Sequence, residues 1–311
     1  MRVPLLFAGD GESARSDKDQ DACARAIGGG DATCEVLGLT TTEATALELL
    51  SAQPRRTALF CDFDGTIAPL VTDPDASRAL PGALRALHEL SREMAVVAAV
   101  SGRSASFLAQ GLELDKYRSK LRAIGLHGLE EWSAGGTIKL KEGVSVWRAA
   151  VETVRARLVE AVPAGVRVED KGYGITVHWR SIAASGDDLK SIGASTTELV
   201  RTIGASYGLL ARLGKASVEL AIPLGIDKGT VVTELCSGLE RAGYLGDDLG
   251  DVLGFRALDR LTASSGLKAV KVAVAGAEAP SELLEAADLV LDGPGAASTF
   301  LQALAGRLAS A

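Results

Sequence analysis

The sequence is poor in cysteine, histidine and aromatic residues, and these shortages exclude several classes of protein. Its four cysteines are scattered over 311 residues without a C-x-x-C pair, which argues against a disulfide framework and against a zinc site. The three histidines form no cluster, so a zinc hydrolase is disfavoured. No apolar run is long enough to span a bilayer, and the first one is too short for a signal peptide. We therefore expect a cytoplasmic protein with reduced thiols.

Positive charge is also scarce. The net charge is −7 and no dense run of Lys or Arg occurs. Nucleic acids and anionic membranes bind to concentrated basic faces, so neither is expected as a partner. A hydrophobic content of 47% with 23% charged residues is typical of a globular chain that folds into one large domain or two ordinary ones. We expect a monomer, in which a few local cations are enough to hold an anionic substrate.

Short apolar strands alternate with helices over most of the chain. After an irregular start over residues 1–40, the first helix is expected at 42–51. Strands are predicted at 57–61, 95–100, 122–127, 244–245, 269–274 and 289–291. Helices are predicted at 82–92, 104–110, 228–241, 251–261 and 281–286, with a further helix at the end. Continuous apolar strands separated by helices indicate a parallel sheet that is covered on both faces.

A block in the middle of the chain interrupts this alternation. A hairpin at 132–140 precedes it. The block itself is predicted to contain two helices, at 145–162 and 187–203, and four strands, at 166–169, 175–180, 206–212 and 217–222. The predicted fold class is therefore α/β: a Rossmann-like, doubly wound parallel-sheet core with an inserted α+β cap. The predicted boundaries are 1–55 for an N-terminal extension, 56–144 and 224–311 for the core, and 145–223 for the cap.

Two groups of acidic residues follow strands of the predicted core. Asp62 and Asp64 come directly after the strand at 57–61, at the edge of the sheet where ligands bind. The second group follows the strand at 244–245 and contains Asp247, Asp248 and Asp251. Either group alone is commonly a solvated loop. Together they predict a site for a hard divalent cation such as Mg²⁺, because carboxylates brought to one point repel each other without one.

Two further segments suit a phosphate group. Ser101, Gly102 and Arg103 lie between a strand and a helix, where the serine hydroxyl and the free N–H groups of the helix would form a phosphate cradle. Lys228 is predicted to begin a helix, against the helix dipole. Neutralising a phosphate would explain its position, although a solvated lysine is an equally good explanation of this residue taken alone.

The order D-x-D-G-T, S-G-R, D-K-G and G-D-D-x-x-D resembles the haloacid dehalogenase superfamily of phosphohydrolases. Within it, residues 57–305 look like the trehalose-6-phosphate phosphatases, which implies a cap of the C2 type. The segment around His127 is similar to the family's H-G-x-E element. Glu169 and Lys171 resemble its E-x-K element, and Arg180 ends a segment similar to H-Y-R. Glu219 resembles the acidic residue that precedes the motif lysine.

The resemblance implies a role for each residue. Asp62 would be the nucleophile that forms an aspartyl phosphate, and Asp64 would protonate the leaving sugar oxygen and then help to deprotonate water. Ser101 and Lys228 would hold phosphate oxygens. Mg²⁺ would be held by Asp62, the Asp64 carbonyl and Asp247, with support from Asp248 and Asp251. The implied substrate-binding residues are Gly102, Arg103, His127, Glu169, Lys171, Arg180 and Glu219.

The chain departs from the family pattern in three places. The run Glu219-Leu220-Ala221-Ile222-Pro223 lacks a basic residue, Trp179 stands for Tyr, and Gly250 stands for Thr. The substrate therefore stays open between trehalose 6-phosphate and a pseudodisaccharide phosphate such as validoxylamine A 7'-phosphate. A mutase, a non-catalytic sugar-phosphate sensor and a protein phosphatase rank lower.

Two further expectations complete the set. The resemblance implies a functional link to a glycosyltransferase similar to trehalose-phosphate synthase. Neither of the histidines outside the cap is expected to be catalytic: His88 is expected on the surface, and His127 is expected to be a structural hydrogen-bonding residue near the junction of core and cap.

Overall fold

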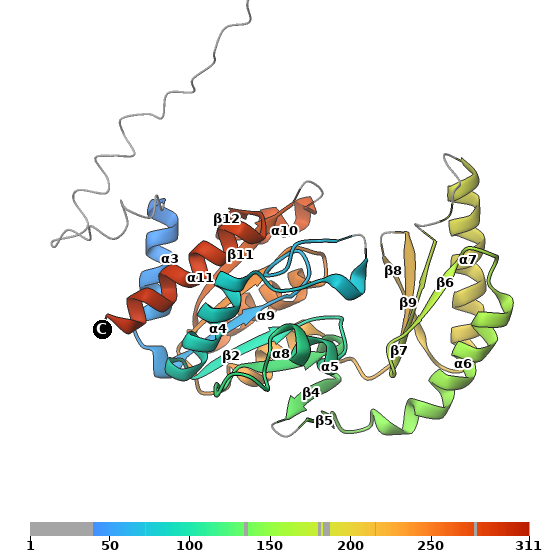
Figure 1. The fold of residues 1–311 in the computed structure, drawn as a ribbon, viewed down its shortest axis with the longest axis horizontal. Helices are drawn as coiled ribbons and strands as arrows, with labels where there is room; N and C mark the ends of the chain where they lie inside the picture. The colour runs from blue at the N-terminus through green and yellow to red at the C-terminus, as the bar shows by residue number, and fades with distance from the viewer. Residues whose placement is uncertain are drawn as a thin grey trace, which may run out of the picture. The chain divides into compact units, whose positions relative to one another are not determined.

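The computed structural model describes residues 40–71, 73–133, 136–179, 182, 187–214, 216–276 and 279–310 (Figure 1). The chain divides into the units Met1–Thr45 and Ala46–Ala311, and every residue discussed below as part of a site belongs to the second. Helix α3 spans Thr41–Ser51, close to the predicted range. Within the described residues no helix combines the length and apolar character needed to cross a bilayer. The two cysteines in this part of the chain, Cys61 and Cys236, are buried free thiols.

An eight-stranded sheet forms the core, in the order β12-β11-β10-β1-β2-β3-β4-β5. Its strands are β1 (Thr57–Cys61), β2 (Val96–Val100), β3 (Arg122–Gly125), β4 (Glu130–Ser133), β5 (Thr137–Leu140), β10 (Arg241–Gly246), β11 (Lys268–Ala275) and β12 (Leu289–Asp292). The strands from β12 to β3 are parallel, and β4 and β5 continue the sheet as an antiparallel hairpin. The strand order reverses between β1 and β10, which is where ligands bind in sheets of this kind.

Helices cover both faces of this sheet, as its apolar strands require. They are α4 (Pro81–Glu93), α5 (Ala105–Gly111), α8 (Lys228–Leu235), α9 (Asp251–Ser265), α10 (Ser281–Ala286) and α11 (Gly293–Ala309). Short 3-10 turns lie at η1 (Pro54–Arg56), η2 (Pro74–Ala76), η3 (Leu126–Gly128) and η4 (Ser145–Trp147). Phe60 and Tyr244 pack with Phe255 of α9 in one cluster, and all five residues of β1 are buried. Full burial of a strand on both faces confirms the predicted doubly wound α/β core.

Residues between β5 and β10 form a second sheet, so the predicted α+β insertion is also confirmed. Its order is β6-β7-β9-β8 and all its pairs are antiparallel. The strands are β6 (Arg167–Asp170), β7 (Gly174–His178), β8 (Leu210–Gly214) and β9 (Ser217–Ala221). Helices α6 (Arg148–Ala161) and α7 (Asp187–Ala205) lie beside this sheet (Figure 1). Alternate strand residues such as Ile175 and Val218 join the helices' apolar residues in one core. The exact domain boundaries stay a prediction.

Several predicted elements have the wrong limits, and glycine or tertiary packing explains three of them. The helix predicted at 228–241 ends at Leu235, since Gly238 takes a φ of 74° and the following residues form β10, whose Ala242 is fully buried. The strand predicted at 206–212 begins only at Leu210, after Gly208 with φ 76°. The strand predicted at 122–127 ends at Gly125, and the chain then turns through η3.

The expectation that His88 lies on the surface is wrong. It is 1% exposed, its Nδ1 lies 2.6 Å from Ser119 Oγ and its Nε2 lies 2.7 Å from the Leu112 carbonyl oxygen. Its ring stacks on Tyr117 at a centroid distance of 4.0 Å. Burial lowers the pKa of His88 below its ordinary value. His88 therefore joins α4 to the loop after α5 as a buried hydrogen-bonding residue.

Candidate active site

The two predicted acidic groups meet at the switch point of the core sheet. The Asp62 N–H donates to the Leu245 carbonyl at 2.9 Å, so the loop after β1 follows the end of β10. Thr66 Oγ1 donates to Asp247 Oδ1 at 2.8 Å. Gly65 has a φ of 80°, and a Cβ there would lie 2.0 Å from Asp247 Oδ2. Only glycine permits this approach, so the D-x-D-G-T turn and the second acidic group form one site.

Lys228 lies inside the acidic cluster. Its side chain is 2% exposed, and its Nζ lies 2.6 Å from Asp251, 2.9 Å from Asp62 and 3.7 Å from Asp248. Burial opposes its charge, but Asp251 and Asp62 outweigh burial and raise the pKa of Lys228 well above its usual value. A capping box at Asp227 begins α8 and fixes the residue. The alternative of a solvated lysine is thereby excluded.

Asp251 organises the loop from within. Its Oδ1 accepts hydrogen bonds from Lys228 Nζ at 2.6 Å and Tyr244 Oη at 2.8 Å. Its Oδ2 accepts from the main-chain N–H groups of Asp247 and Asp248, at 2.9 and 3.1 Å. Four donors use all the lone-pair directions of a carboxylate. Asp251 therefore positions the lysine and the loop, and has no oxygen left for an ion.

The acidic residues around Asp62 fit a divalent cation. One oxygen each of Asp62, Asp248 and Asp251 lies within 4.8 Å of the others, but the Lys228 ammonium already contacts all three. Asp247 Oδ2, in contrast, accepts no hydrogen bond from any residue that the structure describes. Burial and neighbouring carboxylates raise the pKa values of Asp62 and Asp247 to about 7 each. Four carboxylates against one ammonium leave an excess of negative charge that a hard cation would neutralise.

The Asp64 side chain turns away from this cluster. Arg103 donates to it twice, from Nε at 2.6 Å and from Nη2 at 3.0 Å, and Ser77 Oγ donates at 2.7 Å. The Arg103 guanidinium also lies 4.5 Å above the ring of Phe107. The predicted cluster of five carboxylates therefore contains four, and the fifth is held in a bidentate ion pair.

The predicted phosphate cradle differs in one respect from the structure. Two N–H groups in the first turn of α5 are already used: that of Ala105 donates to Glu130 Oε2 at 3.0 Å, and that of Phe107 donates to Ser104 Oγ at 3.3 Å. These two groups are therefore not free for a phosphate, and the predicted cradle itself stays a prediction. The hydroxyl-bearing residue Ser101, directly after β2, is buried at this end of the sheet.

The turn η3 holds the same loop by its main chain. The N–H of Leu126 donates to the Arg103 carbonyl at 2.8 Å, and the N–H of His127 donates to the Ser101 carbonyl at 2.9 Å. Leu126 and His127, two of the three residues of η3, have positive φ, 48° and 58°, which is rare for residues with a side chain. At Gly102 a Cβ would lie 2.8 Å from the His127 ring. These contacts fix the Ser101–Arg103 segment and the His127 ring relative to one another.

Charged residues of the predicted substrate-binding set gather on the cap sheet. Glu169 accepts a hydrogen bond from His178 Nε2 at 2.7 Å, and Glu219 lies 3.6 Å from both Lys171 Nζ and His127 Nε2. Burial works against the charge of Glu219, but His127 and Lys171 outweigh it and lower the pKa to about 2. The last predicted residue of this set, Arg180, lies outside the described residues.

Two departures from the family pattern have a local explanation. Trp179 is buried, and its indole Nε1 lies 2.7 Å from the position of a Cβ at Gly193 of α7. The larger ring is therefore accommodated by a glycine inside the cap. A Cβ at Gly250 would lie 3.0 Å from Asp248 Oδ1, so glycine leaves space beside that carboxylate. Neither departure removes a charged group from the site.

Four residues of the site were not predicted. Tyr244 donates to Asp251, Thr66 donates to Asp247, Ser77 donates to Asp64, and Glu130 caps α5. Thr66 and Glu130 stand inside recognised motifs, so a role for them was within reach of the sequence. Tyr244, in a mostly buried strand that ends just before Asp247, is also a usable signal. Ser77 has no such signal.

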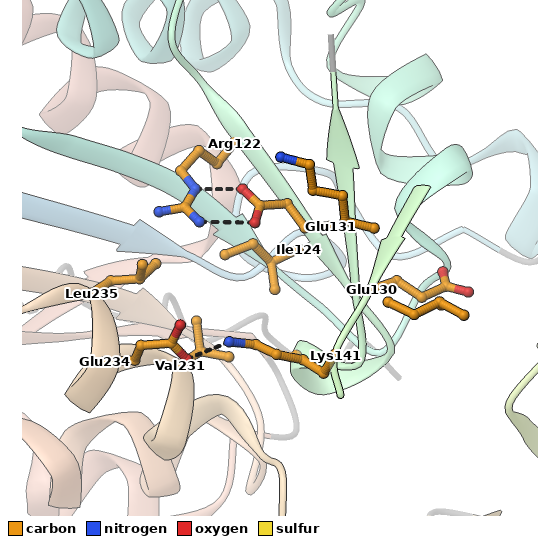
Figure 2. Close-up of a pocket in the computed structure, with 11 residues that line it drawn as sticks. Arg122, Ile124, Glu130, Glu131, Lys141, Val231, Glu234 and Leu235 are labelled. Atoms are coloured by element: carbon orange, nitrogen blue, oxygen red, sulfur yellow. Dashed lines mark hydrogen bonds and ion pairs between the residues drawn. The ribbon is translucent and has the colours of Figure 1, made fainter. Parts of the chain in front are cut away.

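A separate pocket of about 200 Å³ lies between the β3–β5 part of the sheet and α8, and its lining contains none of the predicted site residues (Figure 2). Arg122 makes two hydrogen bonds to Glu131, at 2.6 and 2.9 Å, and Lys141 pairs with Glu234 (Figure 2). These charged side chains pair with one another and leave no net charge to bind an anionic substrate in this pocket. We therefore place the candidate active site at the switch point.

Comparison with known proteins identifies the family of the chain. A family model described as trehalose-phosphatase matches residues 60–288. A trehalose-phosphate phosphatase of Mycobacterium leprae (strain TN) is 32% identical over 152 residues, which are 48% of this chain and 32% of that protein. One from Mycobacterium tuberculosis (strain ATCC 25618 / H37Rv) is 34% identical over 131 residues, 42% of this chain and 32% of the relative. The chain thus spans about a third of the length of these curated relatives.

Solved structures show the same fold. The C-terminal domain of a Candida albicans trehalose-6-phosphate phosphatase superposes with a TM-score of 0.66 at 22% identity, covering 85% of this chain and 96% of that domain. A trehalose-6-phosphate phosphatase related protein gives a TM-score of 0.62 at 24% identity, covering 78% and 95%. These likenesses confirm the predicted α/β core with an inserted α+β domain.

Proposed function

Because the chain belongs to the trehalose-phosphatase family, we propose that it is a phosphoric monoester hydrolase that converts trehalose 6-phosphate into trehalose and phosphate. The observation that carries this proposal is the junction at the switch point, where Asp62 lies against Lys228 and the Asp247 loop. The matching relatives support the substrate class by their names. A phosphorylated disaccharide requires a glycosyltransferase to make it, so we expect the enzyme to act after one.

The first step transfers the phosphoryl group to the protein. An Asp62 carboxylate oxygen attacks phosphorus, the bond from phosphorus to the sugar oxygen breaks, and Asp64 gives a proton to that oxygen. Lys228, charged and 2.9 Å from Asp62, and the Ser101 hydroxyl stabilise the charge on the phosphoryl oxygens. The products of this step are the free disaccharide and an aspartyl phosphate on Asp62.

The second step returns the protein to its starting state. Water attacks phosphorus, Asp64 takes the proton from the water, and the bond between phosphorus and the Asp62 oxygen breaks to release inorganic phosphate. Mg²⁺, held by Asp62, Asp247 and the Asp64 carbonyl, would cancel the repulsion between the nucleophile and the phosphate when bound. Asp248 and Asp251 support this arrangement through the loop, Asp251 by its four hydrogen bonds.

The contacts of Asp64 set a condition on this mechanism. Three hydrogen bonds from Arg103 and Ser77 hold its carboxylate, and an acid must have a free oxygen to carry a proton to the sugar. The ion pair between Arg103 and Asp64 therefore opens when substrate binds. The phosphate of the substrate attracts a guanidinium as strongly as a carboxylate does, so it takes the place of Asp64 beside Arg103. The cap residues Glu169, Lys171 and Glu219, with Arg180 as a further candidate, supply donors and acceptors for the sugar hydroxyls.

Phosphate release across a panel of substrates tests the proposal. The panel contains trehalose 6-phosphate, sucrose 6-phosphate, a pseudodisaccharide phosphate and p-nitrophenyl phosphate, each measured with Mg²⁺. We expect the highest kcat/KM with trehalose 6-phosphate. Asp62→Asn should lose at least about a thousandfold in kcat, whereas Asp115→Asn, on the exposed surface, should match the wild type.

Each other outcome has a definite meaning. Substantial activity in Asp62→Asn would disprove the nucleophile. A higher kcat/KM with sucrose 6-phosphate or the pseudodisaccharide would overturn the substrate but keep the chemistry. Phosphate that moves to another sugar hydroxyl without being released would identify a mutase, and no turnover with any substrate would identify a sensor.

A further inference from the structure

Thr176 lies in the middle of the charged face of the cap sheet. In the register of the strands it stands between Glu169 of β6 and Glu219 of β9. Directly opposed residues of neighbouring strands project from the same face of a sheet. Its neighbours in β7, Ile175 and Val177, point to the other face and pack with the cap helices. Thr176 thus shares a face with the two acids of the predicted substrate-binding set.

The hydroxyl of Thr176 has no partner. The residue is 5% exposed, and its Oγ1 is buried without a hydrogen bond to any residue that the structure describes. The two flanking carboxylates are directed to other groups: Glu169 accepts from His178, and Glu219 lies between Lys171 and His127. A hydroxyl buried in this way lowers stability, and a valine of the same shape would avoid that loss.

We propose that Thr176 is a substrate-binding residue that donates a hydrogen bond to a hydroxyl of the sugar, an inference that rests on the proposed function. A sugar hydroxyl both donates and accepts, so one hydroxyl accepts from Thr176 while it, or its neighbour on the ring, donates to Glu169 or Glu219. Lys171 and His127 lie 3.6 Å from Glu219, beyond hydrogen-bond distance. Hydroxyls of a polyhydroxylated ligand replace the contact of Lys171 with Glu219, which gives the ligand access to the buried hydroxyl.

A second threonine provides a matched control. Thr196 lies in α7, is fully buried and also has an Oγ1 without a hydrogen-bond partner among the described residues. It belongs to a helix, whereas Thr176 belongs to the charged face of the sheet. If an unpartnered hydroxyl were merely a packing feature, Thr176→Val and Thr196→Val would behave alike.

The experiment compares Thr176→Val, Thr176→Ser and Thr196→Val with trehalose 6-phosphate and with p-nitrophenyl phosphate, which has no sugar. For Thr176→Val we expect kcat/KM to fall about tenfold with trehalose 6-phosphate, mainly through a higher KM, because one neutral hydrogen bond is lost. Activity with p-nitrophenyl phosphate should stay within twofold. Thr176→Ser, which keeps the hydroxyl, and Thr196→Val should resemble the wild type with both substrates, and neither valine variant should lower Tm.

Binding of trehalose itself, measured by calorimetry, separates this inference from the proposed function. A wild type that binds trehalose about tenfold more tightly than Thr176→Val supports the role of Thr176 even if no phosphate is released. Equal trehalose binding by both, no binding by the wild type, or equal losses on the two phosphate substrates would overturn it. Thr176→Ala gives the same comparison should the valine variant fail to fold.

Discussion

At the scale of single residues, the buried acids depend on every donor around them, and Tyr244 provides a sensitive test. Tyr244→Phe keeps the ring that stacks on Phe60 and contacts Phe255, but removes one of four donors to a fully buried carboxylate. We expect the free energy of unfolding to fall by about 1–3 kcal/mol in urea denaturation. Tyr207→Phe, which removes a hydroxyl from a half-buried ring in the cap, should change it by less than about 0.5 kcal/mol. Equal values for the two variants would contradict this account of Asp251.

His88 gives stability a dependence on pH. Its pKa is lowered in the folded state because burial disfavours the charged ring, so the unfolded chain binds a proton more readily. Its contribution to stability is therefore complete above pH 6.5 and declines as the pH falls below that value, by at most about 1.4 kcal/mol per unit. The carboxyls of Asp62 and Asp247, with pKa values of about 7, titrate in the same range in both proteins, so the test is the difference in unfolding free energy between the wild type and His88→Gln. Measured between pH 7.5 and 5.5, this difference should shift against the wild type as the pH falls. A difference that stays constant over this range would contradict the assignment to His88.

Residues that carry motifs were predictable, and their supporting partners were less so. Asp62, Lys228 and Asp247 stand at strand and helix ends, which a pattern of apolar runs locates. Ser77 reaches Asp64 from a loop thirteen positions away, and no local rule predicts such a contact. His88 was misjudged because its hydrogen-bond partners, one of them a main-chain carbonyl, come from a distant loop that cannot be paired with it by periodicity.

At the scale of secondary-structure elements, the start of α5 depends on a carboxylate from another strand. Glu130 of β4 is 6% exposed and accepts the N–H of Ala105. Glu130→Ala leaves that N–H buried and unpaired, so we expect a loss of about 1–3 kcal/mol in unfolding free energy and a severalfold loss of kcat/KM through the Ser101 loop. Glu131→Ala removes only a part-exposed ion pair with Arg122 and should lose less than about 1 kcal/mol. The prediction fails if the two variants lose equal stability.

Element types were predictable here, and element limits were not always. Strands buried on both faces are continuous apolar runs, which made β1, β2 and β11 clear. The end of α8 and the start of β10 were obscured because alanine and leucine suit both structures, and only the tertiary core decides which they join. The turn η3 has positive φ at Leu126, a conformation that side chains disfavour and that a sequence pattern does not indicate.

At the scale of the whole molecule, the excess negative charge at the switch point predicts that Mg²⁺ stabilises the fold. A ligand bound only to the folded state at 100 times its Kd adds about 2.7 kcal/mol, so Tm should rise by roughly 5–10 °C between chelator and saturating MgCl₂. Asp247→Asn should lose most of this rise. In chelator it should be at least as stable as the wild type, because it relieves repulsion among buried carboxylates. An equal rise in both proteins, or none in the wild type, would remove Asp247 from the cation site.

The fold class was predictable because alternation of strand and helix has few topological solutions. The packing of the cap face was not. That Thr176 stands between Glu169 and Glu219 depends on the register of three strands. The turn at Gly172 fixes the register of β6 and β7, but β9 follows α7 and β8, and no local turn fixes its register against β7. The hydrogen bond that Glu130 accepts from the start of α5 likewise depends on how the β4–β5 hairpin pairs with the rest of the sheet.

The hydrogen bond between Thr66 and Asp247 joins positions 181 residues apart, with the whole cap between them in the chain. During synthesis Asp62 therefore leaves the ribosome long before Lys228 and Asp251, the groups that hold its charge. A nascent chain ending before α8 has Asp62 without either of these partners. Under the proposed mechanism, turnover would thus begin only once both halves of the core have been made and have closed around the insertion, and it would report complete folding directly.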